Sequence, residues 1–154
     1  MISSELLRRY PFFAGLNLEQ ITVLTKVARE EEVEAGHFFL HEQKESSYLY
    51  LVVEGTVSAV ITVPRHKEIV VGTTGPGDVF GWSALVPPHT ATATVKATKP
   101  CKVIAIDCLQ LLAAFEDDPQ FGYLMMMKIA QVTRDRVTTL TTETLVYLIE
   151  ETGE

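Results

Sequence analysis

The sequence has few of the features that mark secreted and membrane proteins. Only two of its 154 residues are cysteines, Cys101 and Cys108, and they form no Cys-x-x-Cys pair. We interpret them as reduced, packed thiols of a cytoplasmic protein. No apolar run approaches the ~18 residues that span a bilayer, and residues 1–10 lack the apolar core of a signal peptide. The sequence therefore predicts neither a disulfide framework nor a membrane segment.

Clustered positive charge is also absent. The chain has 13 Lys and Arg residues against 20 Asp and Glu residues, a net charge of −7. A surface that binds nucleic acid needs grouped basic side chains, so the composition argues against DNA and anionic membranes as direct partners. One small anion in a local pocket stays compatible with it. A hydrophobic content of 47% excludes a disordered chain, and the length predicts a single domain.

Short strands separated by Gly and Pro fill the middle of the chain, which is typical of an antiparallel roll or barrel. We expect one domain over residues 1–154, with N-terminal helices over 1–29, the β roll over 30–106 and C-terminal helices over 107–150. Residues 48–53 are apolar on both faces, as in a strand covered from both sides. The predicted strands are 31–34, 37–41, 48–53, 57–63, 69–72, 79–80, 91–98 and 101–106.

Three capping signals predict where helices begin. Asn17 followed by Gln20 resembles a capping box. Asp107 precedes a helical pattern that runs through residue 116. Asp118 with Pro119 behind it predicts the start of a final helix of roughly thirty residues.

Residues 75–95, GPGDVFGWSALVPPHTATATV, form the most informative segment. A strand ends at Phe80, and Gly81 permits a backbone conformation that other residues rarely adopt. A short helical turn then begins at Trp82, and its free amides favour an anion. The following strand could bring the hydroxyl of Thr92 or Thr94 to the same point. The pattern is typical of a turn whose amides bind a phosphate. The alternative is a corner of the β roll whose amides bind only water.

Several motifs in order make residues 6–145 similar to the cyclic nucleotide-binding domain family, as found in catabolite activator-like regulators, gated channels and kinase regulatory subunits. The matching segments are PFFAGL at 11–16, Ala-Gly at 35–36, YLYLVVEGTV at 48–57 and GDVFG at 77–81. The resemblance implies an eight-stranded antiparallel β roll of the jelly-roll type, flanked by helices. It also implies a phosphate-binding cassette between two strands and a C-terminal helix that closes over the ligand.

The cassette departs from the family pattern at two positions. Ligand-binding members carry a glutamate for the ribose hydroxyl where this chain has Trp82, and an arginine for the cyclic phosphate where it has Ala91. A charge-assisted hydrogen bond contributes roughly 1.5–3 kcal/mol, so we expect weakened or altered binding of cAMP or cGMP. His89 and Lys96 are candidates to replace the arginine. The resemblance implies a ligand site formed by Phe80, Gly81, Trp82, Ser83, Ala84, Ala91, Thr92, Thr138 and Thr139.

The final helix contributes the last two of these residues. In the family a hydroxyl from this helix often meets the purine edge, which Thr138 and Thr139 would match; a solvated helix face is the alternative. A heptad seam on the same helix predicts a homodimer. The seam comprises Met126, Ala130, Thr133, Val137, Leu140, Thr144 and Tyr147.

Two functions follow from this pattern. The chain is a regulatory ligand-sensing module that signals through its C-terminal helix, or a non-binding interaction and dimerisation module of the same fold. Only about a dozen residues follow Thr142, too few for a helix-turn-helix domain, so we expect no direct DNA binding.

We expect no enzymatic activity, no metal and no cofactor. The segment from Gly81 to Leu85 lacks the final glycine of a nucleophile elbow. His37 and His41 are interpreted as packed or half-exposed side chains. Arg134, Asp135 and Arg136 are interpreted as a charge cluster on the helix surface.

Overall fold

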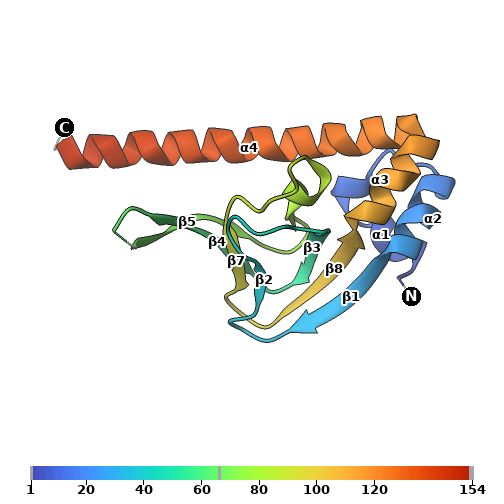
Figure 1. Cartoon of the computed structure of the whole chain (residues 1–154), viewed down its shortest axis with the longest axis horizontal. Helices are drawn as coiled ribbons and strands as arrows, with labels where there is room; N and C mark the ends of the chain where they lie inside the picture. The colour runs from blue at the N-terminus through green and yellow to red at the C-terminus, as the bar shows by residue number, and fades with distance from the viewer. Residues whose placement is uncertain (1, 66, 153–154) are drawn as a thin grey trace.

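The computed structural model describes residues 2–65 and 67–152. Within these residues eight antiparallel strands form two four-stranded sheets with helices at both ends, which confirms the predicted roll (Figure 1). The strands are β1 (Ala28–Val33), β2 (Phe38–Leu40), β3 (Tyr48–Glu54), β4 (Val57–Val63), β5 (Lys67–Thr74), β6 (Val79–Phe80), β7 (Thr94–Ala97) and β8 (Cys101–Asp107). The helices are α1 (Ser4–Arg8), η1 (Pro11–Phe13), α2 (Leu18–Val27), η2 (Trp82–Leu85), α3 (Cys108–Asp117) and α4 (Pro119–Thr152).

The two sheets have the orders β1-β8-β3-β6 and β2-β7-β4-β5. Strand β3 is covered on both faces, as its two-sided apolar pattern predicts. Leu49 and Leu51 face a core shared with the helices, whereas Tyr50 and Val52 face a second core against the other sheet. The first sheet thus separates two apolar cores, and the bend that follows β6 lies at its edge.

The three capping signals are confirmed. Asn17 and Gln20 form a reciprocal capping box, with both hydrogen bonds at 2.9 Å. The Asp107 carboxylate accepts the amides of the first turn of α3, and Asp118 accepts the Phe121 amide at 3.1 Å. Side-chain groups therefore satisfy at least one free amide at the start of each of these helices.

One predicted strand begins too early. The predicted strand 91–98 contains only β7, because the preceding residues pair with a loop instead of a strand. The Ala91 amide donates to the Lys44 carbonyl at 2.9 Å, and the Ala91 carbonyl accepts the Gln43 amide at 2.8 Å. Residue type alone cannot distinguish pairing with a loop from pairing with another strand, since both require an extended backbone.

Helix α4 lies along one side of the roll and is anchored mainly by its first third (Figure 1). Its buried residues are Phe121, Gly122, Met125 and Ile129. From residue 133 to residue 152 every side chain is exposed except that of Arg136, which is half-buried. In the part of the chain that the structure describes, no helix is both long and apolar enough for a bilayer crossing. Cys101 and Cys108 are free and buried, as expected.

Candidate functional site

The bend after β6 is fixed by the backbone of Gly81. This residue has a φ of +83° and is the N-cap of η2. A Cβ atom at this position would lie 2.9 Å from the Tyr48 carbonyl oxygen. Positive φ together with this close approach requires glycine, as predicted, and directs the chain from β6 straight into the turn that carries Trp82.

An aromatic wall supports the bend from behind. The rings of Tyr50 and Phe80 stack with centroids 4.9 Å apart, and Phe39 packs edge-on against both at 5.2 Å. Burial raises the pKa of Tyr50 to about 12, so its phenol stays neutral at physiological pH. The wall therefore supplies shape and rigidity but no charge.

A cavity of about 170 Å³ opens in front of the bend. Strands β4, β5 and β7, the bend itself and helix α4 all contribute to its walls. Six of the predicted site residues line it: Phe80, Gly81, Trp82, Ser83, Ala91 and Thr92. Helix α4 adds Arg136 and Leu140.

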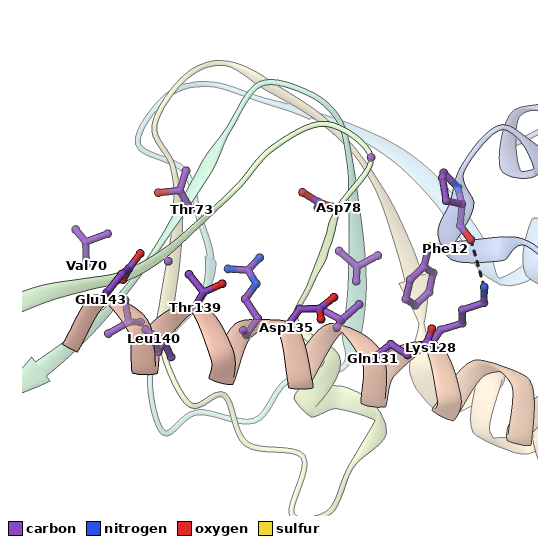
Figure 2. Close-up of a pocket in the computed structure, with 17 residues that line it drawn as sticks. Phe12, Val70, Thr73, Asp78, Lys128, Gln131, Asp135, Thr139, Leu140 and Glu143 are labelled. Carbon is purple, nitrogen blue, oxygen red and sulfur yellow. Dashed lines mark hydrogen bonds between the residues drawn. The ribbon is translucent and has the colours of Figure 1, made fainter. Parts of the chain in front are cut away.

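The other predicted site residues lie elsewhere. Ala84 is buried behind the turn, and Thr138 lines neither of the two cavities next to α4. Thr139 lines a second, larger cavity of about 860 Å³ between α4 and β5. Figure 2 shows Thr73 and Asp78 on the roll side of this larger cavity, with Asp135, Thr139 and Glu143 on the helix side.

The polar side chains considered as substitutes for the cassette arginine do not reach the smaller cavity. The His89 ring contacts the Ala84 carbonyl through Nδ1 at 2.9 Å, and Lys96 is not among the lining residues. The Thr94 hydroxyl accepts the Glu42 amide at 2.9 Å, so it is already engaged. Thr92 is therefore the hydroxyl of the returning segment that faces this cavity.

Arg136 is the residue that the sequence analysis missed. Its Nη2 donates to the Thr74 hydroxyl at 2.6 Å, and its guanidinium carbon lies 5.9 Å from the centroid of the Trp82 ring. A Cβ atom on Gly72 would lie 2.7 Å from Nη1. Its interpretation as part of a surface charge cluster is therefore wrong, whereas Arg134 is indeed exposed.

A sequence signal for Arg136 does exist. Met125 and Ile129 are buried and Val132 is half-buried, at spacings of four and three residues. Arg136 follows four residues later and continues the same face of α4. The predicted heptad seam, through Met126, Thr133 and Val137, lies on a different face of α4.

The smaller cavity is electrostatically simple. Arg136 is the only charged residue among the described residues that line it. No carboxylate lies within ion-pair distance of this guanidinium in residues 2–65 and 67–152. Although the whole chain carries a net charge of −7, this cavity is therefore locally cationic and chemically suited to an anionic group.

The profile of the family described as "Cyclic nucleotide-binding domain" matches residues 30–118, more than half of the chain. The chain belongs to the cyclic nucleotide-binding domain family. The match begins two residues into β1 and ends after α3, so it contains strands β2 to β8 and residues 75–95.

Individual relatives agree with the family assignment. A solved protein of Geobacter metallireducens, described as a cyclic nucleotide-binding protein, is 31% identical; the match covers 89% of this chain and 99% of that one, with a TM-score of 0.80. The "CRP-like cAMP-activated global transcriptional regulator" of Mycobacterium tuberculosis is 24% identical over 130 residues, 84% of this chain. The chain spans only 58% of the length of that regulator.

Family members also occur as parts of enzymes. "Lysophospholipase nte1" of Neosartorya fischeri is 28% identical over 112 residues, which make up 73% of this chain but 7% of that protein. The shared portion is thus a small fraction of the enzyme, while the regulator shares more than half of its length.

Proposed function

We propose that this chain is a regulatory ligand-sensing module whose affinity for cyclic nucleotides is altered or weakened, and that it signals through α4. One observation carries the proposal: α4 contributes Arg136 and Leu140 to the wall of the cavity in front of the cassette bend. A ligand in that cavity would contact the roll and α4 together, so its binding would depend on where α4 lies.

The altered affinity follows from the two cassette substitutions. Ala91 is only 3% exposed, and its backbone amide and carbonyl are both bonded to the loop at 43–44. Its side chain supplies no donor for a phosphate. Trp82 likewise offers no carboxylate for a ribose hydroxyl. The cavity of about 170 Å³ is also smaller than the roughly 300–1,000 Å³ of usual ligand sites.

The signalling step would be a shift between two positions of α4. Beyond Val132 this helix touches the roll mainly through Arg136, so its distal half is weakly held. A ligand that binds more tightly when α4 is closed over the cavity favours that position by its difference in affinity. The resulting helix position is what a partner would read.

We further propose a homodimer formed through α4, with no direct contact to DNA or membrane. Several large apolar side chains are exposed on the distal half of α4, which a second copy could cover. They are Val137, Leu140, Leu145, Val146, Tyr147, Leu148 and Ile149. A cytoplasmic location and the absence of enzymatic activity belong to the same proposal, and the free, buried cysteines support the location.

One observation favours a second function, a non-binding interaction module. The Arg136–Thr74 hydrogen bond and the Trp82 ring already occupy part of the space in front of the bend. If this arrangement is permanent, the roll serves as a scaffold for α4 and the exposed helix face is the functional surface.

Isothermal titration calorimetry with cAMP, cGMP and cyclic dinucleotides separates the two functions. Sensing predicts saturable binding to at least one of them. The dissociation constant should lie in the micromolar range or be higher than that of ordinary family members. The absence of heat with every compound would contradict sensing and favour the interaction module.

The double substitution Trp82→Glu with Ala91→Arg tests where the cassette lies. It restores the ribose acceptor and the phosphate donor, so we expect cAMP affinity to rise at least tenfold over the unmodified chain. Each single substitution serves as a control and should give a smaller gain. Unchanged cAMP affinity in a folded double variant would show that these positions do not face the ligand.

A further inference from the structure

The cavity in front of the cassette bend contains a cation that comes from the opposite side of the site. The family resemblance places the phosphate-binding arginine at the position of Ala91, which lies three residues before β7. The guanidinium that lines this cavity belongs to Arg136 on α4. It reaches the roll at the end of β5, where it donates to the Thr74 hydroxyl.

We propose that Arg136 is the anion-binding residue of this site, and that its ligand is a small molecule with a phosphate or carboxylate group. The proposal rests on the sensing function above and names the charged contact of the same site. It differs from the family arrangement because the cation lies on the moving helix instead of on the roll.

The direct contacts of the Arg136 guanidinium are with uncharged groups. Thr74, which is 4% exposed, offers a neutral hydroxyl oxygen at 2.6 Å. The face of Trp82 lies within the distance of a cation–π contact. Gly72 leaves room for Nη1, because any larger residue there would place its Cβ atom 2.7 Å away. Two residues of β5 and one of η2 thus position the cation.

The charge of Arg136 remains available for a ligand. A guanidinium has five N–H donors in a planar fork, and Thr74 accepts from one nitrogen. No carboxylate pairs with Arg136 among the residues that the structure describes. A half-buried cation with free donors next to a cavity is best satisfied by an anion, and a guanidinium binds the two oxygens of a phosphate or carboxylate at once.

The position of Arg136 also links binding to movement. It lines both the smaller and the larger cavity and is the one half-buried residue in the distal part of α4. A ligand that bonds to its guanidinium and to the roll would hold α4 against the roll directly. No relay through intervening side chains is then needed.

Trp82 provides a direct readout, because it is the only tryptophan in the chain. Without ligand, Arg136→Gln removes the cation from beside its ring and should shift the fluorescence of Trp82. Arg134→Gln is the matched control: it makes the same charge change two residues away on the exposed face of α4. It should leave the emission unchanged. Equal spectra for both variants would overturn the placement of Arg136 beside Trp82.

Binding is measured by titrating cAMP, cGMP, inorganic phosphate and succinate while following Trp82 emission and calorimetric heat. We expect the dissociation constant of each bound probe to rise about tenfold to a hundredfold in Arg136→Gln and to change less than twofold in Arg134→Gln. Arg136→Lys should restore part of the loss, since it keeps the charge but loses the planar fork. Binding of phosphate but not succinate would assign the ligand class to phosphates.

The outcomes separate the two proposals. If the unmodified chain and Arg136→Gln bind a probe equally, the role of Arg136 is refuted while ligand sensing stands. If the unmodified chain binds no probe at all, sensing and the role of Arg136 are both refuted. Circular dichroism of each variant confirms that the loss of binding is not a loss of folding.

Discussion

Gly81 shows how a single residue determines the geometry of the site. It combines a φ of +83° with a Cβ position 2.9 Å from the Tyr48 carbonyl, so both its conformation and its surroundings exclude a side chain. Trp82 and Ser83 owe their places in the cavity wall to this turn. The tight turn after β6 could be predicted from sequence because these constraints are local.

Replacing Gly81 with alanine should therefore destabilise the fold. The left-handed conformation costs roughly 1–2 kcal/mol for an L-residue, and the contact with Tyr48 adds to it. We expect a loss of at least about 2 kcal/mol in the free energy of unfolding, measured by urea titration. Gly75→Ala is the control, since open space surrounds that position, and its effect should stay within about 1 kcal/mol. Equal effects would contradict the proposed strain.

Cys108 gives a prediction about pH. Burial raises the pKa of its thiol from 9.0 to about 12, so the folded state keeps a proton that the unfolded state releases. The stabilisation is complete below pH 9 and is lost as the pH rises towards 12. We expect the free energy of unfolding to fall above pH 9, with a slope of up to about 1.4 kcal/mol per pH unit for this group.

The variant Cys108→Ala isolates this contribution. Urea titrations between pH 8 and 11 should give a shallower decline for the variant than for the unmodified chain, although Tyr50 adds its own decline above pH 10 in both. Identical slopes would mean that Cys108 ionises equally easily in the folded and unfolded states.

Arg136 marks the limit of residue-level prediction. Its neighbours Gly72, Thr74 and Trp82 are more than fifty residues away in sequence, so no local pattern reports the contact. Charge and position on a helix suggested a solvated surface. Only the buried face of α4 through Met125 and Ile129 indicates that Arg136 points towards the roll. That indication is strong only when the packing of α4 against the roll is known.

At the scale of elements, the predictions succeeded where local chemistry decides the structure. Strand β4 has the predicted bounds, and β3 is buried on both faces as its composition indicated. Helices α2, α3 and α4 begin at their predicted caps. The error at residues 91–93 arose because their hydrogen-bond partners lie in a distant loop, which composition does not reveal.

The capping box of α2 allows a test at this scale. Asn17→Ala removes the oxygen that accepts the Gln20 amide at 2.9 Å, so we expect a loss of about 1 kcal/mol in the free energy of unfolding. Asn17→Ser keeps an oxygen at the cap and should cost far less. Chemical denaturation of the two variants side by side measures the difference. An unchanged free energy of unfolding in Asn17→Ala would show that water replaces the Asn17 oxygen as acceptor.

At the scale of the whole molecule, the distal half of α4 is exposed along its length. Sequence pattern predicted a dimer through this helix, and the exposed apolar residues there, including Val137 and Tyr147, support that proposal. An unpaired helix of this kind would present an apolar surface to water over several turns. Its self-association would also place two copies of the ligand site next to a common helix pair.

Analytical ultracentrifugation tests the dimer. Val137→Glu puts a carboxylate on the predicted seam and should raise the dimer dissociation constant at least tenfold, because the charge would lose water on association. Thr142→Glu adds the same charge to the same helix outside the seam and should leave association nearly unchanged. A monomeric unmodified chain at micromolar concentration would refute the dimer.

The burial of α4 ends at Ile129, and this has a geometric consequence for how far its end can travel. At ~1.5 Å per residue, Arg136 lies about 10 Å beyond that fulcrum and Thr152 about 35 Å beyond it. A pivot of about 5° would then displace the guanidinium by about 1 Å but the tip of the helix by about 3 Å. A shift of the guanidinium just large enough to break its hydrogen bond to Thr74 is thereby multiplied about threefold at the tip of the helix, where a docked protein would sense it.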